Sequence, residues 1–194
     1  MKICLLLGSC LFSLLSCGVS RVDNRSPEAE IGNAELKTAE ALIDAFYSFD
    51  KNKLASLLAL ADESRASVIY YQGWAKGGNY KIVERKPCVA TSLNRVSCAI
   101  TVEDDPMLAL KLDFNVTDTF TIAFVDGKIS AADTSSNDMQ IYYDAREWVE
   151  KNYPELIEKP CIGFFVGGPT PGDCAKAMAL GYARFAASED YPSQ

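Results

Sequence analysis

The sequence predicts an α+β fold, in which N-terminal helices pack on a strongly curved antiparallel sheet and a C-terminal helical extension follows. Near the N-terminus, apolar residues repeat at three- and four-residue steps, which is typical of amphipathic helices. Between residues 86 and 133 they instead alternate with polar residues, as in strands that bury one face. Helices that precede a run of neighbouring strands are typical of the α+β class.

The composition limits the number of domains and the kind of partner. A chain of 194 residues is long enough for one domain with a hydrophobic core and short for two. Its net charge of −7 repels phosphate backbones, so we expect no nucleic-acid partner. The chain has no histidine, which excludes histidine-dependent mechanisms and most transition-metal sites, and we expect no metal.

The first residues read as an export signal. Met1 and Lys2, with the apolar run to Leu15, have the length of a signal peptide and are too short for a spanning helix of about 20 residues. The stretch from Leu14 to Cys17 resembles the bacterial lipobox, so residues 1–16 are expected to be a lipoprotein-type signal peptide. The alternative is ordinary secretion with cleavage near Gly18.

A lipid on Cys17 would anchor the protein to a membrane of the bacterial cell envelope, with the domain in the periplasm or outside the cell. Residues 17–33 show no periodicity and are expected to form a flexible tether between the membrane and the domain.

Three helices are expected at the start of the domain. Residues 34–49 place their apolar side chains on one stripe, residues 54–60 suggest a second short helix, and residues 64–75 form a third. Gly77-Gly78 ends this part, because glycine weakens a helix by about 1 kcal/mol per residue.

The strand that we expect to organise the sheet runs from Leu108 to Thr117, where apolar and polar residues alternate. A turn at residues 104–106 precedes it, and Asp126-Gly127 has the composition of a tight hairpin after it. The other strands are expected at 80–91, 96–103 and 120–124.

Two helices are expected in the C-terminal extension, residues 139–194. Asp138 is expected to cap the first, which Pro154 ends. Asp173 is expected to cap the second, in which Gly181 and several alanines allow close packing.

Four cysteines lie beyond the export signal, and export favours disulfides over free thiols. Three pairings are open on sequence alone. Local geometry favours Cys88–Cys98, which flank a turn, and Cys161–Cys174, which bracket a Gly/Pro-rich loop. A crosslink across that loop is worth roughly 3 kcal/mol. The rival interpretation, a four-thiolate zinc site, lacks any Cys-x-x-Cys pair.

Two stretches resemble the nuclear transport factor 2-like superfamily, also called the SnoaL-like or cystatin-like cone superfamily. Ala-Leu-Ile-Asp-Ala-Phe-Tyr-Ser-Phe-Asp at 41–50, followed by residues 54–57, resembles its opening helix pair. Residues 119–129, with an Asp-Gly-Lys-Ile turn, resemble its penultimate hairpin. The resemblance covers roughly residues 34–138, and the chain from residue 139 onward departs from it.

The resemblance implies a bent sheet wrapped around a long helix, with a pocket at the open end of the cone. It does not imply one activity, because enzymes and non-catalytic binding domains share this fold. The loop residues Phe164, Phe165 and Val166 could plug such a cone or contact a partner. The loop lacks the Gly-Lys-Ser/Thr ending of a phosphate-binding loop, and we expect no cofactor.

Enzymes of this superfamily generally place an Asp or His base, often with a Tyr donor, inside the cone, so a base here must be a carboxylate. Asp133 is the candidate base, because it shares parity with Ile129 and Ala131, and Tyr47 and Tyr71 are candidates for the donor. The alternative is that Asp133 simply lies at the end of a strand.

Other residues are assigned structural roles or pocket positions. Asp113 is expected to be solvated and Asp50 to end the first helix. The residues expected to line a ligand pocket are Phe46, Trp74, Phe114 and Phe120, although aromatic residues at such spacing usually belong to the core.

The leading hypothesis is a lipid-anchored envelope protein whose non-catalytic domain binds a small apolar ligand or a protein partner. The alternative is a SnoaL-like hydrolase or isomerase that uses a carboxylate base and a tyrosine. A third hypothesis is an assembly protein that forms a homodimer through the outer face of its sheet.

Overall fold

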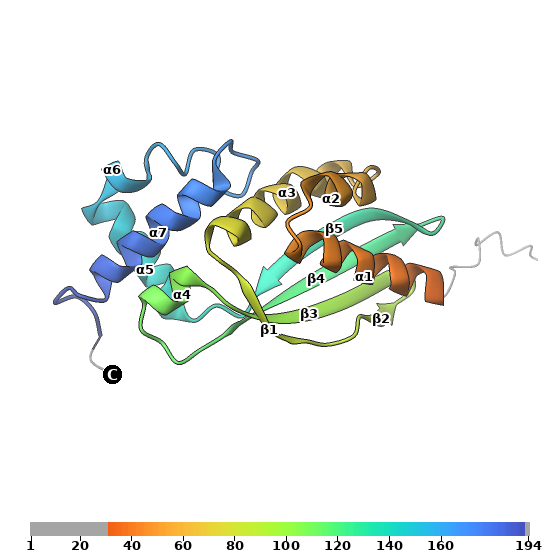
Figure 1. Cartoon of the computed structure of the whole chain (residues 1–194), viewed down its shortest axis with the longest axis horizontal. Coiled ribbons are helices and arrows are strands. Elements are labelled where there is room, and N and C mark those ends of the chain that lie inside the picture. The colour runs from red at the N-terminus through yellow and green to blue at the C-terminus, as the bar shows by residue number, and fades with distance from the viewer. Residues whose placement is uncertain (1–30, 193–194) are drawn as a thin grey trace, which may run out of the picture.

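The computed structural model describes residues 31–192 and has the α+β architecture that the sequence predicts (Figure 1). The N-terminal helices are α1 (Asn33–Tyr47), α2 (Lys51–Leu57) and α3 (Asp62–Gly77). The strands are β1 (Lys81–Arg85), β2 (Val89–Ser92), β3 (Arg95–Glu103), β4 (Val116–Val125) and β5 (Lys128–Ser136), and α4 (Asp105–Ala109) lies between β3 and β4. The C-terminal helices are α5 (Gln140–Asn152), α6 (Pro154–Ile157) and α7 (Pro171–Phe185).

The sheet is antiparallel and open, with the order β1-β3-β4-β5. Strand β2 pairs with the first part of β3, on the same edge where β1 pairs with its last part. Asp126 and Gly127 both have a positive φ, 49° and 71°, at the turn between β4 and β5. Such a pair of left-handed residues matches the twist of the two strands, so the predicted hairpin is present.

Strands β3 and β4 bury alternate residues, and α1 and α3 lie against this inner face (Figure 1). Phe46 of α1 and Phe120 of β4 are fully buried, with ring centroids 4.9 Å apart in an edge-to-face arrangement. Trp74 of α3 belongs to the same buried core. The helices and the sheet therefore share one hydrophobic core.

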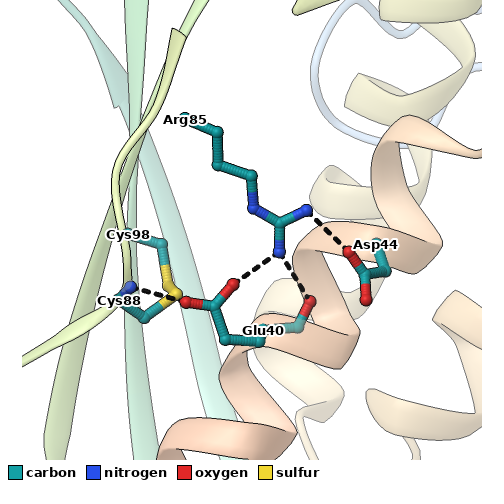
Figure 2. Close-up of a disulfide and its surroundings, with 5 residues drawn as sticks. All are labelled: Glu40, Asp44, Arg85, Cys88 and Cys98. Carbon is teal, nitrogen blue, oxygen red and sulfur yellow. Dashed lines mark hydrogen bonds and ion pairs between the residues drawn. A yellow bond between two sulfur atoms is a disulfide. The ribbon is translucent and has the colours of Figure 1, made fainter.

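Helix α1 is also held to the β1–β2 edge by a polar clamp, which Figure 2 shows. The Arg85 guanidinium donates to Glu40 at 2.5 Å and to Asp44 at 2.6 Å. The second carboxylate oxygen of Glu40 accepts the backbone N–H of Cys88 at 2.6 Å, beside the Cys88–Cys98 disulfide. The clamp thus fixes the disulfide-bearing edge of the sheet relative to α1.

The expectation of a strand from Leu108 to Thr117 is wrong for most of its length. Asp104 caps α4 instead, because its carboxylate accepts the backbone N–H of Met107 at 2.9 Å. Pro106 lies in the first turn of α4, where the N–H that it lacks has no partner in the helix. Strand pairing begins only at Val116.

The alternation that suggested this strand is nevertheless present in the burial of the side chains. Between α4 and β4, Leu112 and Phe114 are half-buried against the core, whereas Lys111, Asp113 and Asn115 are exposed. The segment follows the surface of the core without pairing with another strand. Period-two burial therefore does not require a sheet partner.

Two of the expected helix caps are also wrong. Asp138 does not cap α5, since its carboxylate accepts a hydrogen bond from Ser136 Oγ at 2.5 Å and the helix begins at Gln140. Asp173 lies inside α7, which begins at Pro171. Asp50 follows α1 as expected, and its carboxylate caps α2 by accepting the Lys53 N–H at 3.0 Å.

The C-terminal helices gather at one end of the sheet, with α7 in contact with α3, α4 and α5 (Figure 1). Gly181 of α7 faces Val149 of α5, and a Cβ on Gly181 would meet the methyl groups of that valine. The second disulfide joins Cys161 to Cys174, and both disulfides are the pairings that local geometry favours. Among the described residues, no helix has the length and apolar character needed to cross a membrane.

Candidate functional site

The polar residue at the centre of the molecule is Asp118, on the inner face of β4. Its neighbours along that face are Val116 and Phe120, and its side chain is fully buried. Tyr71 of α3 donates its hydroxyl hydrogen to Asp118 Oδ1 at 2.5 Å, and Tyr47 of α1 donates to Oδ2 at 2.7 Å. A single carboxylate thus connects both helices to the sheet.

The two tyrosines reach Asp118 because their rings pack within the core. The Tyr47 and Tyr71 rings lie 4.9 Å and 5.2 Å from the Phe46 ring. The Tyr71 ring also stacks on the Phe120 ring, with the centroids 6.4 Å apart. The Tyr80 ring lies edge-on to the Tyr71 ring, with the centroids 6.2 Å apart. These contacts fix the phenol rings and so orient both hydroxyl groups toward Asp118.

Burial controls the protonation of this group. It raises the pKa of Asp118 from 3.8 to about 6, and the hydrogen bonds from Tyr71 and Tyr47 oppose the rise because they favour the carboxylate. The pKa of Tyr47 and the pKa of Tyr71 lie well above their ordinary value, mainly because both rings are buried and also because Asp118 is negatively charged. Both phenols therefore remain donors at neutral pH.

A second buried carboxylate, Asp104, belongs to the same polar group. Burial raises its pKa from 3.8 to about 7, although the hydrogen bond from Met107 opposes the rise and the charge of Asp118 adds to it. Its Oδ2 atom has no hydrogen-bond partner among the described residues. Tyr80, whose pKa is raised well above its ordinary value by burial first and then by Asp104, completes the group.

A cavity lies elsewhere, on the outer side of α3. Its volume is about 460 Å³, which is in the range of small-molecule sites. Phe49, Ile69 and Tyr70 supply its apolar part, and Lys51 and Lys76 its charges. The remaining lining residues are Ala66, Gln72, Gly73, Gly167, Gly168, Pro169 and Pro171.

The far wall of this cavity is the loop that the Cys161–Cys174 disulfide closes. The rings of Phe164 and Phe165 lie 5.3 Å and 5.7 Å from Trp74. The Phe165 ring also lies 5.8 Å from the Tyr71 ring. The aromatic pair therefore covers the end of α3 near the Asp118 group, and the glycines that follow it border the cavity.

The structure brings two of the predicted site residues together and places the third elsewhere. Tyr47 and Tyr71 meet at one carboxylate, but that carboxylate is Asp118. Asp133 is exposed on the other face of the sheet. A bulge in β5 pairs Ala131 with Ala123 and Ile129 with Phe124, so the parity that placed Asp133 with Ile129 is wrong.

The residues predicted to line a pocket belong to the core. Phe46, Trp74 and Phe120 are buried, and Phe114 packs against the same cluster. None of the four lines the cavity beside α3. The predicted lipidation site, Cys17, lies outside the described residues.

The sequence did contain a signal for the two acids that the prediction missed. Asp118 interrupts an even-numbered apolar row on β4, and Asp104 continues the even-numbered row of β3. A charged residue at an inward position is rare unless it is paired, so it marks a buried polar group.

No group of three or more potential metal-binding side chains occurs in residues 31–192. Comparison with known proteins gave no match: no family model, no curated protein and no solved structure is significantly similar to this chain.

Proposed function

We propose that the chain is an exported, lipid-anchored envelope protein whose nuclear transport factor 2-like domain binds a small apolar ligand or a protein partner without catalysis. The observation that carries the non-catalytic part is the state of Asp118, which is fully buried and receives a tyrosine hydrogen bond on each oxygen. A general base must reach a proton of its substrate. Here the carboxylate instead joins α1 and α3 to β4.

The family part of the proposal is supported by the two motifs. Residues 41–50 and 54–57 lie in or next to the helix pair α1 and α2, and residues 119–129 lie in the β4–β5 hairpin. The export part is supported by the two disulfides, which form and persist in oxidising compartments. The binding part is supported by the cavity of about 460 Å³ beside α3.

Native mass spectrometry of the detergent-extracted protein tests the proposal. We expect a lipid mass that disappears in Cys17→Ser, and a bound small molecule or protein that is retained in Asp118→Asn. A protein without lipid, or without any bound species, would contradict the corresponding part. The same measurement reports the number of subunits and so tests a homodimer.

The second candidate is a SnoaL-like hydrolase or isomerase, favoured by one observation. A carboxylate with a pKa near 6 and two tyrosine donors within 3 Å is a suitable set for general acid–base catalysis. Such an enzyme also needs a concave pocket at the carboxylate, whereas the cavity described above is lined by other residues. Conversion of a co-purified ligand by the wild-type protein, lost in Asp118→Asn, would favour the enzyme.

A further inference from the structure

We propose that the cavity beside α3 binds a small amphipathic anion, with its apolar body against α3 and its carboxylate between Lys51 and Lys76. This inference rests on the proposed binding function and names the class of ligand. It also moves the binding site from the interior of the predicted cone to the groove between α3 and the disulfide-closed loop.

The apolar part of the cavity has the composition of a ligand site. Phe49 and Ile69 are half-buried, so each presents part of its surface to the cavity. Tyr70 also lines the cavity, and its ring packs against the rings of Phe164 and Phe165 in the loop. The two half-buried side chains therefore offer apolar surface to the body of a ligand.

The charge of the ligand follows from the two lysines. Lys51 and Lys76 come from different helices, line the same cavity, and form no ion pair with any described residue. The chain as a whole has a net charge of −7, so two unpaired cations at one cavity are a local exception.

The wall opposite α3 consists of loop backbone. Gly167, with a φ of 97°, and Gly168 bring the loop backbone to the cavity without side chains. The Cys161–Cys174 disulfide limits how far this loop can move from α3. The site is therefore formed in advance, with an apolar floor, a backbone wall and two charges.

The test compares 2-naphthoate with 2-naphthalenemethanol, which has the same ring system without the charge. Both are titrated calorimetrically into the full chain carrying Cys17→Ser. Exposed ion pairs are individually weak, and two lysines together should make 2-naphthoate bind roughly tenfold more tightly than the alcohol.

Matched charge variants test whether Lys51 and Lys76 cause the preference for 2-naphthoate. Lys51→Gln with Lys76→Gln should abolish the preference for 2-naphthoate and leave the affinity for the alcohol unchanged. Lys37→Gln with Lys53→Gln removes the same charge from exposed positions outside the cavity and should keep the preference. Equal binding of both probes to the wild type would contradict an anionic ligand. A preference that survives the first double variant would do the same.

A variant that fills the cavity tests whether the two probes bind there. Ala66→Trp places a large side chain at the exposed cavity rim and should weaken the binding of both probes at least tenfold, while circular dichroism reports an unchanged fold. Unchanged affinity would overturn this cavity as the site. Failure of both probes to bind would overturn the ligand class alone if native mass spectrometry still finds a bound species, and the binding function as well if it finds none.

Discussion

Asp118 occupies a position on β4 where the neighbouring inward residues are valine and phenylalanine. A buried carboxylate is costly unless it is hydrogen-bonded, and here two phenols supply the bonds. Its partners come from two different helices, so the polar interaction specifies how α1 and α3 sit on the sheet. These bonds do not fully offset the cost of burying the charge, and the pKa of Asp118 is therefore raised.

This raised pKa predicts a pH dependence of folding stability. Between about pH 4 and 6 the folded protein keeps a proton on Asp118 that the unfolded chain has released, so the free energy of unfolding falls as the pH rises. The rise in the pKa of Asp118 from 3.8 to about 6 corresponds to about 3 kcal/mol. Asp118→Asn should therefore lose about 3 kcal/mol less than the wild type between pH 4 and 7, measured by urea unfolding.

The control for this pH experiment is Asp113→Asn, because Asp113 is exposed. Its stability should change with pH in parallel with the wild type. If Asp118→Asn shows the same pH slope as the wild type, Asp118 does not titrate as described.

Tyr71→Phe tests the hydrogen bond itself. Loss of a bond to a charged group typically costs about 1.5–3 kcal/mol, and Tyr71 is buried, so water cannot replace the phenol. Denaturant unfolding at pH 7.5 should show this loss. Tyr143→Phe, which removes an exposed and long contact of 3.5 Å to Asp138, should leave the stability within about 0.5 kcal/mol of the wild type.

At the scale of secondary-structure elements, the clamp between α1 and the β1–β2 edge makes a second prediction (Figure 2). Glu40 accepts from both Arg85 and the Cys88 backbone, whereas Asp44 accepts from Arg85 alone and its side chain is 57% exposed. Glu40→Gln should cost about 1–3 kcal/mol and Asp44→Asn less than about 1 kcal/mol. Equal costs in urea unfolding would contradict the two-sided role of Glu40.

The contact between α5 and α7 is a matter of side-chain volume. Gly181→Val would place methyl groups where Val149 already lies, and overpacking of this kind costs about 1–3 kcal/mol. Ala183→Val, at an exposed position of the same helix, also introduces a β-branched side chain, but without the clash. Thermal unfolding should show a clear loss for the first variant and a change within about 0.5 kcal/mol for the second.

Some elements could be predicted from sequence because their determinants are local. The stripe of apolar residues in α1 and the Asp126-Gly127 turn act over a few neighbouring residues. The stretch after Asp104 could not, because one alternating pattern fits both a strand and an irregular segment lying on the core. What distinguishes them is the cap at Asp104 together with Pro106, which start a helix.

At the scale of the whole molecule, the Cys161–Cys174 disulfide closes a loop between residues 13 positions apart. On the chain-entropy model it stabilises the protein by restricting the unfolded chain, by about 3 kcal/mol. Replacing both cysteines with alanine should lower the free energy of unfolding by about that amount, measured in urea without reductant. An unchanged free energy would show that the loop is held by its aromatic contacts alone.

Periodicity and nearby residues are enough to predict the α+β class, the first three helices, the final hairpin and the chemistry that favours disulfides. The carboxylate that meets the tyrosines and the location of the cavity could be identified only in the folded molecule. Tyr47 and Tyr71 lie 71 and 47 positions before Asp118 in the chain. The cavity is lined by α3 and by a loop that lies much later in the chain. Such distant partners are selected by burial and packing, which a linear pattern does not encode.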